Sequence, residues 1–135
     1  MDYILDACAL IAFLNDENEA DAVADLFERA ERGADRLFMS SVQVLEVYYD
    51  RIYIRDIEYA DTFLDSLHTS PITILPEITR AIIREAGRFK TSYSMSLADS
   101  IAVATAKSLG MVLVTKDPEL KAAVEAKEFS VLWLN

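Results

Sequence analysis

Three acidic side chains lie within stretches of the sequence that are otherwise apolar. Asp6 is the only charged residue between Tyr3 and Leu14. Glu46 lies inside the segment VLEVYY, and Asp99 lies inside LADSIAVATA. Carboxylates are rarely buried unless they are paired, hydrogen-bonded or bound to a metal ion, because an ion that loses its hydration without compensation is strongly disfavoured. The sequence therefore predicts that another group compensates these charges in the folded chain.

Helix capping is a simpler interpretation of some of these acids. Asp6 could cap the helix that follows it, and Asp117 precedes a proline, a combination typical of a helix start. Asp99 stands three residues after Ser96, which is capping-box spacing. Glu46 lies too far into its predicted helix to cap it, although its side chain could simply reach solvent. From these residues alone, capping and a functional role both remain open for the three aspartates.

Taken together, the four acids fit a site for a hard divalent cation. In a parallel α/β sheet, Asp6 and Asp117 would stand just beyond the carboxyl ends of two strands, where ligands usually bind. Glu46 and Asp99 would project from the first turns of the neighbouring helices. Such a set of oxygen donors suits Mg²⁺ or Mn²⁺, and without a cation the carboxylates would repel one another.

The composition excludes several other kinds of chemistry. The chain has 135 residues, 53% of them hydrophobic, which predicts one domain over 1–135, and its net charge of −10 leaves no broad basic surface. One cysteine, Cys8, and one histidine, His68, argue against disulfides, zinc clusters and Ser-His-Asp catalysis. No apolar run approaches 18 residues, and no basic residue precedes the first apolar stretch. We therefore expect a soluble, cytoplasmic protein with no membrane association.

Short apolar strands alternate with helices along the chain. Strands are expected at 3–5, 36–39, 72–75, 111–115 and 130–134, although the third could also be a loop. Helices are expected at 17–32, 40–54, 57–67, 77–90, 96–109 and 118–127. Ser40 and Gln43 have capping-box spacing, and Gly110 is expected to end the helix before it. This order predicts the α/β class: a three-layer α/β/α sandwich with a short, mainly parallel central sheet.

Three segments carry a resemblance to a known family. YILDACALIAFLNDE, SSVQVLEVYY and SLADSIAVATAKSLGMVLVTKDPEL together resemble the PIN domain, and most closely the small VapC-type toxin ribonucleases of toxin–antitoxin pairs. The similarity spans residues 3–120, and the third segment is its most specific part. The resemblance implies a PIN-like fold.

The resemblance also implies roles for individual residues. The acidic metal-binding quartet of the family corresponds to Asp6, Glu46, Asp99 and Asp117. Thr115 matches the small hydroxyl residue of the family's T-x-D element. Family members often carry Ser or Thr where this chain has Cys8, a poorer hydrogen-bond donor, which we interpret as a small core residue.

The activity implied by the resemblance is hydrolysis of phosphodiester bonds in single-stranded RNA. An endoribonuclease of this kind uses Mg²⁺ or Mn²⁺ to activate a water for in-line attack and leaves a 5′-phosphate. Asp6, Asp99 and Asp117 would bind the metal, and Glu46 would either bind it or orient the attacking water. The resemblance further implies a homodimer and a cognate antitoxin, whose helix and basic side chains occupy the acidic crevice.

Two surfaces could meet these partners. Two rows of basic residues could track RNA phosphates or could be ordinary solvated helix faces: Arg80, Arg84, Arg88 and Lys90, and Arg51 and Arg55. Lys116, beside Asp117, could also touch a substrate phosphate. The net charge of −10 suits a basic antitoxin. A groove for the antitoxin could be formed by the apolar face of 17–32 with Tyr48, Tyr49 and Tyr53, unless these side chains belong to the core.

Two other functions compete with this hypothesis. A catalytically inactive, PIN-like interaction domain would keep the carboxylates as caps and members of polar networks. A phosphoryl-transfer domain of the receiver or haloacid-dehalogenase kind would use an aspartate after the first strand. The dehalogenase pattern needs a second acid where this chain has Cys8, and the acidic residues of a receiver are not evident. Stabilisation by Mg²⁺ or Mn²⁺ would favour the metal-dependent nuclease.

Overall fold

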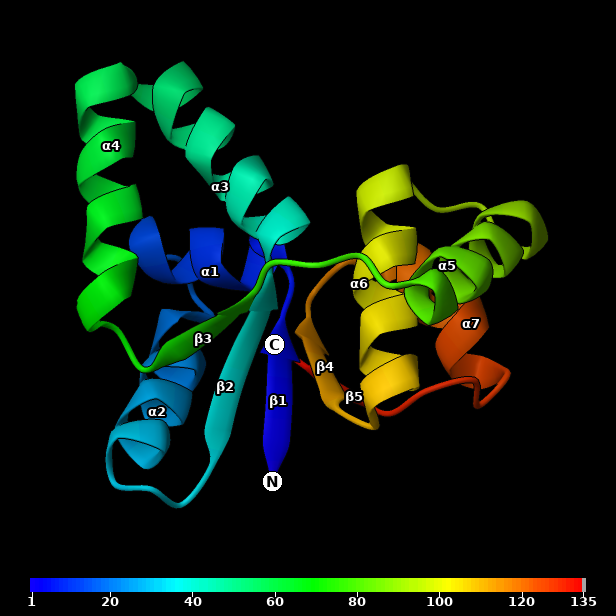
Figure 1. Cartoon of the computed structure of the whole chain (residues 1–135). Coiled ribbons are helices and arrows are strands. Elements are labelled where there is room, and N and C mark those ends of the chain that lie inside the picture. Colours follow the sequence, from blue (N-terminus) through cyan, green and yellow to red (C-terminus); the bar gives the residue numbers. More distant parts are fainter. Residues whose placement is uncertain (135) are drawn as a thin grey trace.

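A parallel sheet forms the centre of the computed structural model, which describes residues 1–134. Its strands are β1 (Asp2–Leu5), β2 (Arg36–Ser40), β3 (Ile72–Leu75), β4 (Val112–Thr115) and β5 (Val131–Trp133). They lie in the order β3-β2-β1-β4-β5, and every neighbouring pair is parallel (Figure 1). Ile4 of β1 is in register with Phe38 on one side and Leu113 on the other. The chain builds outward from β1 in both directions, so the strand order reverses beside β1, where α/β sheets bind ligands.

Helices cover both faces of this sheet, which confirms the predicted three-layer α/β/α sandwich. One face is covered by α1 (Ala7–Leu14), α2 (Ala20–Glu31), α3 (Ser41–Ile54) and α4 (Ile57–Ser66), followed by the short turn η1 (Leu67–Thr69). The other is covered by α5 (Arg80–Ser92), α6 (Leu97–Leu109) and α7 (Lys121–Glu125), which follows the turn η2 (Pro118–Leu120) (Figure 1). Among the helices of residues 1–134, none has both the length and the apolar character that a membrane span requires.

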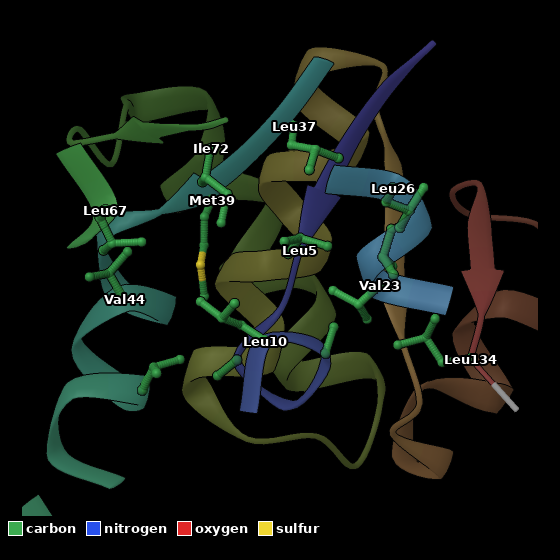
Figure 2. Close-up of a cluster of buried hydrophobic side chains, with 14 of the residues drawn as sticks. Leu5, Leu10, Val23, Leu26, Leu37, Met39, Val44, Leu67, Ile72 and Leu134 are labelled. Atoms are coloured by element: carbon green, nitrogen blue, oxygen red, sulfur yellow. The ribbon is translucent and has the colours of Figure 1, made fainter. Parts of the chain in front are cut away.

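The strands send alternate side chains into two separate cores. Leu5 belongs to the cluster under α1–α4, whereas its neighbour Ile4 packs with α5–α7. Figure 2 shows the first cluster, in which Leu5 and Met39 of the sheet lie beside Leu10 of α1. Because both faces are buried, the strands are short runs of apolar residues, as parallel sheets require.

Several predicted helix ends are confirmed. Asp6 caps α1, and its side chain accepts a hydrogen bond from the Ala9 N–H. Ser96 caps α6, which ends at Gly110 with φ at 66°, the left-handed conformation that favours glycine. Asp6 and Ser96 thus fix the N-terminal ends of α1 and α6, which face the carboxyl edge of the sheet.

Other boundaries differ from the prediction. The segment 17–32 contains a helix only from Ala20, and a separate helix, α1, precedes it. The apolar sequence of α1 hides the usual helical periodicity, because it packs among α2, α3 and the sheet. Helix α5 begins at Arg80 rather than at 77, since the side chain of Thr79 caps it, and continues through Ser92.

The predicted capping box at the start of α3 is only half formed. The Ser40 hydroxyl accepts a hydrogen bond from the Val42 N–H, as an N-cap should. The side chain of Gln43 does not return to Ser40 but bonds to α1 and α6 instead.

Candidate metal centre

Acidic residues from distant parts of the sequence meet in one cavity at the carboxyl end of the sheet. The cavity has a volume of about 400 Å³. Asp6 directly follows β1, and Asp117 lies two residues beyond β4. Helices α3 and α6 contribute Glu46 and Asp99. All four predicted acids therefore line the same cavity, whose wall also includes Cys8, Gln43, Tyr49 and Glu119.

Asp6 is the most buried of the four acids, with 2% of its surface exposed. Its Oδ1 accepts hydrogen bonds from the Ala9 N–H at 2.9 Å and the Cys8 thiol at 3.0 Å. Burial raises the pKa of Asp6, and the nearby charge of Asp117 adds to this effect. Capping and membership of the cavity are thus not alternatives for this residue.

Glu46 faces the cavity from the second turn of α3. It is half-buried, and the Tyr49 hydroxyl donates a hydrogen bond to its Oε2 at 3.3 Å. Burial raises the pKa of Glu46, and the charges of Asp6 and Asp117 contribute to the increase. The side chain does not simply extend into solvent, which was the alternative interpretation.

Asp99 and Asp117 form the tightest part of the acidic set, together with Glu119. One carboxylate oxygen from each of the three lies within 4.8 Å of the others. Burial raises the pKa of Asp99 to about 7, and the proximity of Asp117 contributes. The Ser96 hydroxyl accepts a hydrogen bond from the Asp99 N–H at 3.1 Å, so the predicted cap is present.

Glu119 was not among the predicted site residues. It lies in the turn η2, and its N–H donates to Asp117 Oδ1 at 2.9 Å, so Asp117 caps this turn. The exposed position and the polar surroundings of Glu119 give no sequence signal that separates it from other surface acids.

Thr115 and Cys8 both lie beside the acids of the cavity. Thr115 is fully buried. Its hydroxyl accepts a hydrogen bond from the Asp117 N–H at 3.0 Å and so positions the backbone of Asp117. The prediction that Cys8 is a core residue is wrong: it is half-buried and lines the cavity, 3.6 Å from the Thr115 hydroxyl. Burial and the charge of Asp6 raise the pKa of Cys8 to about 12. Its thiol therefore donates a hydrogen bond to Asp6.

The donor set fits a hard divalent cation. The cavity presents carboxylate oxygens, and no histidine contributes to its lining. The pKa values of Asp6, Glu46 and Asp99 are all raised, because burial and like charges disfavour ionisation there. Mg²⁺ and Mn²⁺ prefer oxygen ligands and would relieve this repulsion.

Three of the predicted cations are engaged in contacts within the chain. Arg51 is buried and donates to Asp50 and Asn15, because α3 packs against α1. Lys116 bonds to Glu17 at 2.7 Å and also lies near Glu19. Arg88 forms ion pairs with Glu85 and Glu128. The remaining residues of the two rows are exposed: Arg55, Arg80, Arg84 and Lys90.

The proposed groove residues also separate into two groups. Val23 and Leu26 of α2 are buried in the first core cluster, so the apolar face of this helix is not available to a partner. On α3, 44% of Tyr49 and 86% of Tyr53 are exposed, and their rings meet edge to face. Tyr48 is half-buried and donates a hydrogen bond to Asp61 at 2.5 Å.

Solved structures with the same fold cover nearly the whole chain. VapBC2 from Rickettsia felis, bound to a DNA fragment from its promoter, matches over 100% of both chains with a TM-score of 0.75 and 16% identity. VapBC-1 from nontypeable Haemophilus influenzae matches over 98% of both chains with a TM-score of 0.72 and 20% identity. DNA-bound VapBC from Salmonella typhimurium matches over 98% of this chain and 97% of its own, with a TM-score of 0.72 and 14% identity. At these identities the similarity shows a shared fold.

Comparison of the sequence with family patterns identifies the protein family. Comparison with curated protein sequences yields no significant match. The sequence pattern of the PIN domain family matches residues 3–126, a stretch that includes all four predicted acids. Since this match covers most of the chain, and the fold and the acidic cavity agree with it, the chain belongs to the PIN domain family.

Proposed function

We propose that this protein is a metal-dependent endoribonuclease that hydrolyses single-stranded RNA in the cytoplasm and acts as a VapC-like toxin. The observation that supports this proposal best is the convergence of Asp6, Glu46, Asp99 and Asp117 in one cavity. Like charges that are brought together at a folding cost are typical of a functional site. Membership of the PIN domain family and the similarity to VapBC structures point to the same activity.

In this proposal, the residues of the cavity divide the work between binding and orientation. Asp6, Asp99 and Asp117 would bind Mg²⁺ or Mn²⁺. Thr115 would position Asp117 through the hydrogen bond that its hydroxyl accepts from the Asp117 N–H. The bound ion supplies Lewis-acid chemistry for phosphodiester hydrolysis. Glu46, held by the Tyr49 hydroxyl, is either a further ligand or the group that orients the attacking water.

Metal-dependent stabilisation tests the proposal against an inactive interaction domain. We expect Mn²⁺ to raise the thermal unfolding midpoint of the wild type. At a free Mn²⁺ concentration one hundred times the dissociation constant, the free energy of unfolding should increase by about 2.7 kcal/mol. Asp6→Asn should lose this response together with RNA cleavage. Asp25→Asn, which alters an exposed acid on α2, should keep both. An Asp6→Asn variant that cleaves RNA at the wild-type rate would contradict the assignment.

A second variant separates the two roles of Glu46. If Glu46 is a ligand, Glu46→Gln should weaken Mn²⁺ binding in a calorimetric titration. If it orients the water, binding should stay near the wild-type value while the cleavage rate at saturating Mn²⁺ falls.

We further propose an antitoxin partner that binds the hairpin of α3 and α4. These two helices stand side by side above the sheet (Figure 1). They expose large apolar side chains that a partner could cover: Leu45, Tyr49, Tyr53, Ile54, Ile57 and Leu64. The solved relatives are VapBC assemblies, and the net charge of −10 suits a basic partner. Co-expression with the product of an adjoining short reading frame, followed by co-purification, tests this partner.

A homodimer is the remaining part of the proposal. Ile83 on α5 and Leu97 on α6 are largely exposed beside an apolar cavity of about 450 Å³. Light scattering of the purified chain should give twice the mass of 15.1 kDa, and Ile83→Glu should shift the protein toward the monomer.

A further inference from the structure

Gln43 is completely buried between the helices that carry the acids. It lies on α3, three residues before Glu46, and its side-chain amide bonds in two directions. Its Oε1 accepts a hydrogen bond from the Ala7 N–H at 2.8 Å, and its Nε2 donates to the Ala98 carbonyl at 2.8 Å. Only this orientation of the amide satisfies both partners, because an N–H can only donate and a carbonyl can only accept.

The two partners of Gln43 are the chain neighbours of two cavity acids. Ala7 follows Asp6, and Ala98 precedes Asp99. Ala7 is the first residue of α1, so its N–H has no partner within the helix and is free to take the Gln43 oxygen. The amide of Gln43 therefore ties the starts of α1 and α6 to α3, which itself carries Glu46.

The neutrality of the Gln43 side chain matters as much as its hydrogen bonds. Three carboxylates that face one cavity repel one another in the absence of a cation, and the repulsion tends to separate the elements that carry them. A lysine or arginine at the position of Gln43 would neutralise part of the site and compete with a cation. An amide supplies both a donor and an acceptor and leaves the negative potential of the cavity unchanged.

We propose that Gln43 is a positioning residue that sets the spacing of Asp6, Glu46 and Asp99 before a divalent cation binds. This inference rests on the proposed metal-dependent function, and it adds a residue outside the acidic quartet. Gln43 does not bind the cation itself in this proposal, since both of its polar atoms are already engaged by the backbone. Its contribution is preorganisation, which lowers the cost of gathering the ligands.

The test compares Gln43→Met with a matched core variant. Methionine has a similar length but makes neither hydrogen bond. We expect Gln43→Met to weaken Mn²⁺ binding by about 10- to 100-fold in calorimetric titrations, the usual cost of losing a group that orients metal ligands. Val23→Ala, which truncates a buried side chain of α2, should lose stability but keep the wild-type Mn²⁺ affinity. At saturating Mn²⁺, Gln43→Met should regain most of its RNA cleavage, because the group takes no part in the chemistry.

The possible results separate this inference from the proposed function. If the wild type binds Mn²⁺ and Gln43→Met binds it equally well, the positioning role is rejected while the metal-dependent function stands. If the wild type does not bind Mn²⁺, the proposed function fails, and the positioning role fails with it. A loss of affinity in Val23→Ala equal to that in Gln43→Met would also overturn the inference, because general destabilisation would then explain both.

A measurement on the wild type covers the case in which Gln43→Met does not fold. In the metal-free protein, we expect the Ala7 N–H and the side-chain amide protons of Gln43 to be protected from hydrogen exchange, and Mg²⁺ to change this protection little. Exchange at the rate of an exposed amide would show that the connection is not formed before the cation binds, and would overturn the inference.

Discussion

The acidic cavity and the cluster around Glu128 both gather ionisable side chains, but only the second neutralises its own charges. Arg88 of α5 donates to Glu128 at 2.9 Å and to Glu85 at 2.8 Å, and Lys107 of α6 lies within 3.4 Å of both glutamates. The Tyr93 hydroxyl donates to Glu128 as well. These partners, Arg88 above all, lower the pKa of Glu128 to about 2.

The cavity shows the opposite pattern. Burial and neighbouring acids raise the pKa of Asp6 and of Glu46, and that of Asp99 to about 7. In the Glu128 cluster, opposite charges stabilise one another within the chain. In the cavity, the buried like charges destabilise the folded chain unless a ligand of opposite charge binds. The two clusters therefore differ in the direction of the carboxyl pKa shifts: the pKa is lowered where basic side chains pair with the acids and raised where acids meet in the cavity.

The largest expected effect is on catalysis. Asp99→Asn should reduce Mn²⁺-dependent RNA cleavage by more than about a hundredfold, because loss of a ligand exceeds the usual cost of losing a group that only orients one. Glu128→Gln, the matched change in the other cluster, should leave the cleavage rate near that of the wild type. Cleavage assays of both variants at saturating Mn²⁺ measure the difference. Equal losses in the two variants would remove the distinction between the clusters.

The two clusters should respond to pH in opposite directions. The pKa of Asp99 is raised from 3.8 to about 7, so the folded, metal-free protein binds more protons than the unfolded chain between these values. Its free energy of unfolding should therefore fall as the pH rises through this window. The pKa of Glu128 is lowered from 4.5 to about 2, so its contribution is present above 4.5 and is lost as the pH falls toward 2.

Thermal unfolding in a chelating buffer at several pH values measures this response. Asp99→Asn should flatten the decline above about pH 5, and saturating Mn²⁺ should do the same in the wild type, because the cation favours the ionised carboxylates. A wild-type midpoint that rises between about pH 5 and pH 8 without metal would contradict the assigned repulsion.

A smaller effect is expected on stability when the Glu128 cluster is broken. Glu128→Gln removes the charge that Arg88 and Lys107 share, and should lower the free energy of unfolding by about 1 kcal/mol at neutral pH, as for other partly exposed ion pairs. Asp99→Asn should instead stabilise the metal-free protein at the same pH. Denaturant titrations of the two variants give these signs. A stabilised Glu128→Gln variant would show that the network is not a source of stability.

The smallest expected effect concerns Cys8. Cys8→Ser replaces the thiol that donates to Asp6 with a hydroxyl, which is a better donor of similar size. We expect stability to change by less than about 0.5 kcal/mol and the cleavage rate to stay within about threefold of the wild type. Cleavage and unfolding measurements on this variant, in parallel with Asp99→Asn, check the difference in scale. A hundredfold loss would mean that the thiol has a specific role in the cavity.

Much of the fold could be predicted because its signals are local. Strand residues such as Ile4 and Leu113 lie in short apolar runs, and Ser96 and Gly110 mark the two ends of α6 within a few residues. The four acids were predictable because each interrupts an apolar segment or follows a strand, or matches the family's pattern. Helix α1 was harder to place, because a helix buried on most sides lacks the alternation of polar and apolar residues that reveals a helix.

The remaining features depend on contacts between distant segments. Arg51 lies in a helical row of basic residues, yet it is buried against Asn15 of the preceding helix pair. Gln43 has capping-box spacing from Ser40. Its side-chain amide instead bonds to the backbone of Ala7 and Ala98, which are 36 and 55 residues away in the sequence. The position of Glu119 beside Asp99 depends on how η2 turns back toward α6.

The sequence by itself determined the strands, most of the helices and the parallel class of the sheet, and it singled out the four acids that line the cavity, because burial patterns and caps act over a few residues. The tertiary structure decided which charges meet. It gathered the acids in a cavity that no Lys or Arg of residues 1–134 lines, and it placed Arg88 and Lys107 beside Glu128 instead. Electrostatic energies depend on distances in space and on burial, and neither quantity is fixed by separation along the chain.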